Sequence, residues 1–150
     1  MNEIRNRKLK KIMDESQIYN LLMEFDSVFP HLHEKIDSYG EYAQKLSSYA
    51  YVCVYRVENE NAGLLVYYAN DLVQKTGYIS LIGVKDKWKG KGIGKDLLFY
   101  AFKSAKENGM KCMKLEVDSD NEHAIEFYRR NGFVFCEDKN EMSMYMVKQL

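Results

Sequence analysis

The stretch YISLIGVKDKWKGKGIGK, residues 78–95, joins a strand-like segment to a glycine-rich loop and the start of a helix. Its first part, residues 78–84, is almost continuously apolar, which is typical of a central strand covered on both faces. Three glycines then stand at alternate positions, Gly90, Gly92 and Gly94, directly before an amphipathic segment. This order predicts an anion-binding loop, because the N–H groups of a helix's first turn have no partner inside the helix.

The loop is strongly basic in an otherwise neutral protein. It carries five lysines, at positions 85, 87, 89, 91 and 95, against the single acid Asp86, which gives it a local charge of +4. The whole chain balances 22 basic against 22 acidic residues, so general affinity for nucleic acid or an anionic membrane is not expected. The sequence therefore predicts a phosphate-bearing ligand at this loop.

Two familiar phosphate loops do not fit the spacing. A nucleotide-triphosphate loop needs a glycine five residues before its Gly-Lys pair, but Lys89 stands there, and Asp96 occupies the position of the metal-binding hydroxyl. A dinucleotide-binding loop needs a third glycine where this chain has Lys95. Hydrolysis of nucleoside triphosphates and binding of NAD are thus not expected.

Helical and extended patterns alternate along the rest of the chain and predict a mixed α/β fold. The expected helices run from Asp14 or Ser16 to Pro30, and over about 32–48, 92–108 and 121–130. The expected strands cover about 9–12, 49–58, 62–70, 78–84, 112–118, 133–137 and 143–148.

Three local features refine this outline. The polar residues 59–61 predict a hairpin turn, and Gly109 is placed to cap the helix over 92–108 in a left-handed conformation. Gly83, inside a strand, indicates a bulge or a close approach of another group. Because strands 78–84 and 112–118 flank one helix, they should be parallel neighbours with a right-handed crossover.

Composition limits the remaining classes. At 150 residues without a linker or repeat, the chain is expected to form one domain, 1–150. The cysteines show no C-x-x-C spacing, and His31 and His33 cannot share a helix face, so no metal site is expected. Residues 1–11 are basic but lack the apolar run of a signal peptide, and no membrane-length apolar stretch is present. We expect a cytoplasmic protein, and the residue usage favours a bacterium with AT-rich DNA.

The loop resembles the signature of the GNAT superfamily of acyl-CoA-dependent N-acetyltransferases, which reads Gln/Arg-x-x-Gly-x-Gly/Ala. Here the six residues are Lys89-Gly90-Lys91-Gly92-Ile93-Gly94, with lysine at the first position. A second element, from Leu115-Glu116-Val117 to Asn131-Gly132-Phe133, is similar to the strand and helix that flank the pantetheine arm in this family. The resemblance covers about residues 76–137.

This resemblance implies a fold, a co-substrate and a reaction. The fold is an α/β (α+β) sheet that is mostly antiparallel, with one splayed parallel strand pair and about four helices. The co-substrate is acetyl-CoA, and the acetyl group passes directly to a primary amine of a small molecule, amino sugar or peptide in a ternary complex. No metal, nucleic acid or membrane is expected, and the protein is expected to be a monomer or homodimer.

The resemblance also assigns roles to residues. Binding of acetyl-CoA falls to Ile82, Val84, Lys89, Gly90, Lys91, Gly92, Ile93, Gly94, Lys95, Asn121 and Tyr128. The backbones of Ile82 and Val84 hydrogen-bond pantetheine, and the Val84 N–H donates to the oxyanion. Tyr128 protonates the departing thiolate.

Each assignment has a plainer alternative. The alternative for Tyr128 is a core-facing aromatic position, and Asn121 equally suits an ordinary helix cap. Because residues 78–84 contain no glutamate, the best substitute for a general base is Glu116, with Asp118 on the same strand face and a purely structural carboxylate as alternatives. The lack of that glutamate also motivates a rival function, a non-catalytic acetyl-CoA-binding regulatory or partner-binding module. Asp71 follows Tyr67 and Tyr68 closely, and two interpretations stay open for it: a contact with the acceptor amine, or a polar residue at the end of a strand.

Overall fold

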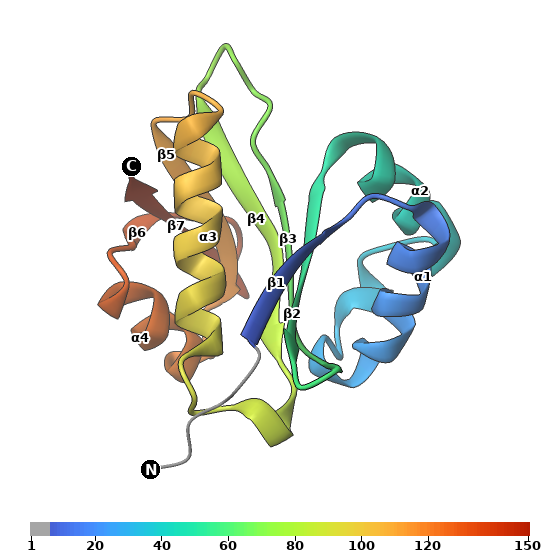
Figure 1. Cartoon of the computed structure of the whole chain (residues 1–150). Coiled ribbons are helices and arrows are strands. Elements are labelled where there is room, and N and C mark those ends of the chain that lie inside the picture. The colour runs from blue at the N-terminus through green and yellow to red at the C-terminus, as the bar shows by residue number, and fades with distance from the viewer. Residues whose placement is uncertain (1–6) are drawn as a thin grey trace. The chain divides into compact units, whose positions relative to one another are not determined.

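The computed structural model describes residues 7–150 (Figure 1). Residues 1–6, the first part of the basic stretch for which no signal peptide is expected, lie outside the described residues. The strands are β1 (Arg7–Ile12), β2 (Tyr51–Val57), β3 (Glu60–Tyr68), β4 (Thr76–Val84), β5 (Cys112–Asp118), β6 (Val134–Asp138) and β7 (Ser143–Gln149). The α-helices are α1 (Glu15–Glu24), α2 (Tyr39–Tyr49), α3 (Ile93–Glu107) and α4 (Glu122–Arg130). Short 3₁₀ turns are η1 (Asp26–Val28), η2 (Leu32–Glu34) and η3 (Asp86–Trp88).

The seven strands of the described part form one mixed sheet in the order β1-β2-β3-β4-β5-β7-β6. Strand β4 is the fourth of the seven, which confirms its expected central position. It pairs with β5 in parallel, from Thr76 opposite Cys112 to Ile79 opposite Leu115. Strands β1 and β2, β5 and β7, and β6 and β7 are antiparallel pairs, so the predicted fold class is confirmed.

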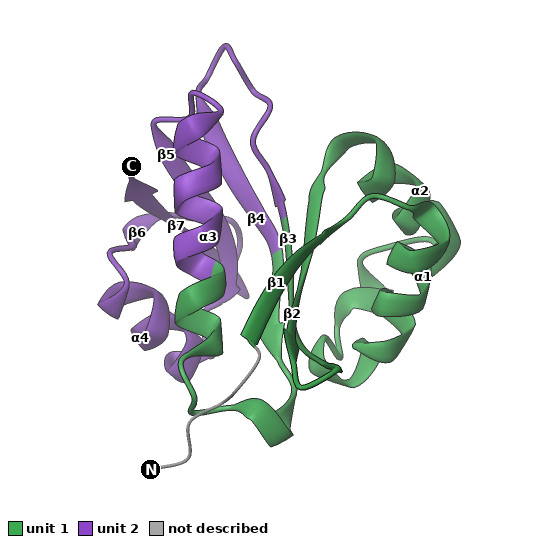
Figure 2. Ribbon diagram, viewed as in Figure 1, with its two compact units in different colours: residues 1–66, 81–97 green, residues 67–80, 98–150 purple. Residues whose placement is uncertain are grey.

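The chain divides into two compact units, coloured green and purple in Figure 2. Of the described residues, unit 1 comprises 7–66 and 81–97, and unit 2 comprises 67–80 and 98–150. Unit 1 therefore holds the glycine loop, and unit 2 holds β5 and α4.

In unit 1, side-chain caps decide where the first two helices begin. The Asp14 carboxylate accepts a hydrogen bond from the Gln17 N–H (3.0 Å), as expected for the cap of α1. The prediction that the second helix begins near residue 32 is wrong. That segment forms the 3₁₀ turn η2, and α2 begins at Tyr39, because Ser38 is extended and its hydroxyl caps the Glu41 N–H (3.1 Å).

The hairpin of β2 and β3 is confirmed, but its turn lies earlier than expected. Glu58 and Asn59 form a two-residue connection with positive φ angles of 53° and 77°, as a type I′ turn requires. Strand β3 therefore begins at Glu60, inside the segment expected to turn. The residues from Ala62 to Val66 are all buried, so both faces of this strand are covered.

Glycines mark two close approaches within unit 1. A Cβ on Gly83 would lie 2.5 Å from Val28 and 2.8 Å from Phe29, so the predicted close approach at this glycine comes from the η1 segment. A Cβ on Gly63 would lie 3.1 Å from both Ile93 and Leu97. The first turns of α3 therefore pack tightly on β3, which fixes the helix that follows the glycine loop.

In unit 2, α4 packs on an aromatic cluster. The Phe133 ring lies 5.7 Å from the rings of both Phe102 and Tyr128, and Met113 and Leu115 of β5 are buried. Gly109 has a φ of 88°, which is the left-handed conformation expected after α3.

Candidate functional site

The glycine loop exposes its backbone at the N-terminus of α3. Gly90 and Gly92 have φ angles of 75° and 82°, and a Cβ at either position would meet nothing within 4 Å. The Asp96 N–H donates to the Gly92 carbonyl (3.1 Å), which begins the helical hydrogen bonds. The preceding N–H groups, such as those of Ile93 and Gly94, have no acceptor inside the helix. This loop offers donors and space for an anion, as its sequence predicts.

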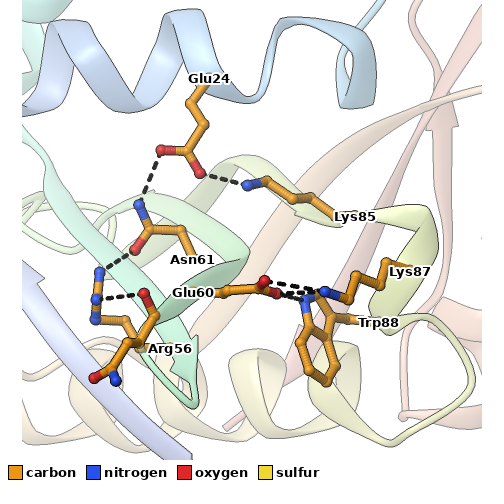
Figure 3. Close-up of polar contacts among 8 residues, drawn as sticks. Glu24, Arg56, Glu60, Asn61, Lys85, Lys87 and Trp88 are labelled. Atoms are coloured by element: carbon orange, nitrogen blue, oxygen red, sulfur yellow. Dashed lines mark hydrogen bonds and ion pairs between the residues drawn. The ribbon is translucent and has the colours of Figure 1, made fainter.

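Carboxylates engage Lys85, Lys87 and Lys89 of the loop. Lys85 pairs with Glu24, the Lys87 ammonium lies 2.9 Å from Glu60, and the Lys89 ammonium lies 2.9 Å from Asp86. The first two contacts, and the Trp88 indole that donates to the same Glu60 (3.2 Å), are drawn in Figure 3. The local positive potential is therefore smaller than the sequence count suggests. For an anion at this loop, the backbone N–H groups are therefore the more important expected donors.

At the end of β4, the backbone N–H and C=O groups of two residues point away from the neighbouring strand β3. The Lys85 N–H donates to the Ala62 carbonyl (2.9 Å), and in an antiparallel pair only alternate residues bond to the partner strand. The backbone N–H and C=O groups of Val84 and Ile82 therefore face away from β3. Both residues are half-buried, and the pantetheine and oxyanion contacts expected of their backbones stay a prediction.

Tyr128 lies on α4 among aromatic rings. The residue as a whole is half-buried, and its ring lies 5.5 Å from that of Phe127 and 5.7 Å from that of Phe133. Burial of the phenol raises its pKa to about 12. Tyr128 is therefore a proton-bearing hydrogen-bond donor throughout the physiological pH range, whether it packs a core or serves a ligand.

Glu116, the candidate base, is engaged by a lysine that the sequence did not single out. Its carboxylate accepts a hydrogen bond from the Lys139 ammonium (2.9 Å), and its side chain is 16% exposed. The same hydrogen bond raises the pKa of Lys139. Lys139 lies in the connection between β6 and β7, and no local motif relates it to β5. Asp118 follows two residues after Glu116 on the same strand and therefore shares its face.

Two further candidates have ordinary structural roles. The Asn121 side-chain oxygen accepts from the Ala124 N–H (3.1 Å), so this residue caps α4. The Asp71 carboxylate accepts from the N–H groups of Val73 (3.1 Å) and Gln74 (2.9 Å), which makes it part of a turn after β3. Neither arrangement tests a contact with a ligand.

Among residues 7–150, no three or more histidine, cysteine, aspartate and glutamate side chains are grouped so that they could hold a metal ion. None of the helices in that range has the length and apolar character needed to cross a bilayer.

Comparison with known proteins identifies the family. The family described as the acetyltransferase (GNAT) family matches residues 15–133, and the chain belongs to it. A similar curated protein is the mycothiol acetyltransferase of Nocardiopsis dassonvillei, which is 32% identical over 64 residues. That match spans 43% of this chain but only 19% of the relative, so the chain corresponds to a small part of it.

Solved structures show the same fold over nearly the whole chain. The IAA acetyltransferase from Bacillus cereus ATCC 14579 has a TM-score of 0.76 at 20% identity, covering 97% of this chain and 100% of that one. A GNAT family acetyltransferase from Elizabethkingia anophelis, with acetyl-CoA bound, has a TM-score of 0.73 at 18% identity, with coverages of 97% and 99%. At these identities the likeness establishes the fold.

Proposed function

We propose that this protein is an acetyl-CoA-dependent N-acetyltransferase acting on a primary amine of a small molecule, amino sugar or peptide. The observation that carries the proposal is the open glycine backbone before α3, since a diphosphate suits a helix N-terminus with adjacent free N–H groups. Membership of the family and a structural neighbour that holds acetyl-CoA support CoA as the phosphate ligand. We further propose a single domain over residues 1–150, in the bacterial cytoplasm, as a monomer or homodimer.

In this proposal the backbone of residues 89–95 holds the diphosphate of CoA. The N–H and C=O groups of Ile82 and Val84 hydrogen-bond the pantetheine arm, because they face away from β3. Asn121 keeps its amide nitrogen for the co-substrate while its oxygen caps α4. No metal takes part in this binding scheme.

The residues stabilise charge while the amine attacks. The amine nitrogen forms a bond to the thioester carbonyl carbon, and the bond from that carbon to sulfur breaks. The Val84 N–H donates to the carbonyl oxygen as negative charge develops there. Tyr128 donates a hydrogen bond to the departing sulfur. With a phenol pKa of about 12 against about 8.5 for a thiol, full proton transfer is uphill, so solvent supplies the thiolate's final proton.

The proton lost by the amine needs an acceptor, and Glu116 is the proposed base. Its ion pair with Lys139 must loosen, or pass the proton through water, for the carboxylate to accept it. This contact favours the second candidate function, a non-catalytic acetyl-CoA-binding module, because it keeps the only proposed glutamate base occupied.

A thiol-release assay with acetyl-CoA and a panel of amines separates these functions. We expect CoA release that depends on the amine, with acetylated amine identified by mass. Tight CoA binding by calorimetry without turnover on any amine of the panel supports the non-catalytic module. Absence of CoA binding contradicts both functions.

A further inference from the structure

Arg7, the first residue of β1, reaches the glycine loop although 84 residues separate it from Lys91 in the sequence. Its Nη2 donates to the Lys91 carbonyl (3.0 Å), and its Nη1 lies 3.4 Å from the Asp96 carboxylate. Lys91 stands between the two left-handed glycines, and Asp96 is in the first turn of α3. One guanidinium therefore ties the loop to the helix that follows it.

A second strand secures the same carboxylate. The Tyr55 hydroxyl of β2 donates to the Asp96 carboxylate (2.8 Å) and accepts from Arg7 Nη1 (3.5 Å). Tyr55 is only 4% exposed, and its burial, followed by the hydrogen bond to Asp96, raises its pKa. Because Tyr55 stays protonated, it remains a donor, and Asp96 is held in place for Arg7.

The contact with the Lys91 carbonyl differs from the ion pairs of the loop lysines. The pairs of Lys85, Lys87 and Lys89 join side chains and hold no peptide group of residues 90–94, and those of Lys85 and Lys87 are drawn in Figure 3. In a trans peptide the carbonyl of one residue and the N–H of the next point in opposite directions. Fixing the Lys91 carbonyl toward Arg7 therefore turns the Gly92 N–H to the opposite side.

This contact matters because ordering a glycine-rich backbone is entropically unfavourable. Glycine loses more conformational freedom than any other residue when it is fixed, and this loop has three glycines in five positions. An arginine that already holds the loop removes part of this cost before a ligand arrives.

We propose that Arg7 is a positioning residue that holds the glycine loop in the shape that binds the diphosphate of CoA. The proposal rests on the proposed function and adds a residue outside the family signature and outside the region of sequence resemblance. Arg7 touches the loop's own backbone, not the ligand.

The test compares Arg7→Ala and Arg7→Lys with Lys10→Ala, an exposed residue on the same strand. With acetyl-CoA we expect Arg7→Ala to lower kcat/KM about tenfold through KM, while kcat changes less than about twofold. With S-acetylpantetheine, which lacks the diphosphate, all variants should match the wild type. Arg7→Lys should recover part of the loss, because one ammonium can bond the carbonyl but cannot span both acceptors. Equal losses with both thioesters, or no loss with acetyl-CoA, would overturn the proposal.

Hydrogen exchange of the ligand-free protein provides a readout that does not depend on the enzymatic activity. Amides of residues 90–94 should exchange faster in Arg7→Ala than in Lys10→Ala or the wild type. Equal exchange in all three proteins overturns the positioning role. If the wild type binds no CoA, the proposed function fails, and the exchange comparison still decides whether Arg7 holds the loop.

Discussion

In the proposed function, the glycine loop contributes backbone groups and the β5–α4 region contributes side chains. The loop presents backbone groups, opened by two glycines with positive φ angles at the start of α3. The β5–α4 region presents side chains, the phenol of Tyr128 and the carboxylate of Glu116, whose properties depend on their neighbours. A backbone site is thus encoded by a short local motif, whereas a side-chain site depends on residues that are distant in sequence.

Tyr128→Phe should have the largest effect, lowering turnover while leaving CoA binding nearly unchanged. Removal of the hydroxyl takes away the donor to the departing sulfur, so we expect kcat to fall at least about 100-fold. The dissociation constant of CoA should change less than about threefold, since the loop is untouched. Steady-state kinetics and calorimetry measure the two quantities.

The matched control is Tyr19→Phe, because Tyr19 is an exposed tyrosine on α1. It should behave as the wild type. Parallel losses of turnover and CoA affinity in Tyr128→Phe would assign Tyr128 a packing role and remove it as the hydrogen-bond donor to the departing sulfur.

Gly92→Ala should show the reverse pattern, with weaker CoA binding and nearly unchanged turnover. A side chain at a φ of 82° strains the backbone, although the space around it is open, so unfolding should become easier by about 1 kcal/mol. We expect CoA to bind about tenfold more weakly, as distorted N–H groups hold the diphosphate less well, while kcat at saturating acetyl-CoA stays near the wild-type value. Gly40→Ala in α2 is the control and should stabilise the fold by about 0.5 to 1 kcal/mol. A Gly92→Ala protein with unchanged CoA affinity contradicts the backbone role of the loop.

Local patterns predicted much of the structure around the loop. The residues within each segment were enough to predict the apolar strand, the glycine loop, the amphipathic helix and Gly109 as its cap. The predicted parallel pairing of β4 with β5 is also confirmed. The start of α2 was missed because Leu32 and Ile36, four residues apart, have helical spacing, whereas the capping residue Ser38 decides the boundary.

The electrostatics of the candidate site could not be predicted in the same way. Lys139 reaches Glu116 from 23 residues away, and Glu24 and Glu60 reach the loop lysines from α1 and β3. Arg7 reaches Lys91 of the loop from 84 residues away. Such pairs leave no periodic signal, because they depend on which segments the fold brings together.

Glu116→Gln tests whether the side-chain region contains a base. We expect kcat/KM for the amine to fall about fivefold to tenfold at pH 7. The loss should shrink as the pH rises toward 9, because a larger fraction of the amine is then already deprotonated. Glu137→Gln is the control, since Glu137 is an exposed partner of Lys114 on β6. A loss that does not depend on pH would indicate a structural carboxylate, with Asp118 as the next candidate.

The smallest expected effect concerns stability at high pH. The pKa of Tyr128 in the folded protein is raised to about 12, above about 10 for an unfolded tyrosine. The folded state therefore keeps this proton longer, and the resulting stability is fully present below pH 10 and lost as the pH rises toward 12. Between pH 9 and 11, the wild type should lose about 1 kcal/mol more of its unfolding free energy than Tyr128→Phe, measured by chemical denaturation.

Tyr39 and Tyr55 also have raised pKa values, but they are present in both proteins and cancel in the difference. Gly92→Ala removes no titrating group and should follow the wild-type pH dependence. Equal pH dependence in wild type and Tyr128→Phe would mean that the phenol is well solvated, and the contrast between a backbone region and a buried side-chain region would then fail at Tyr128.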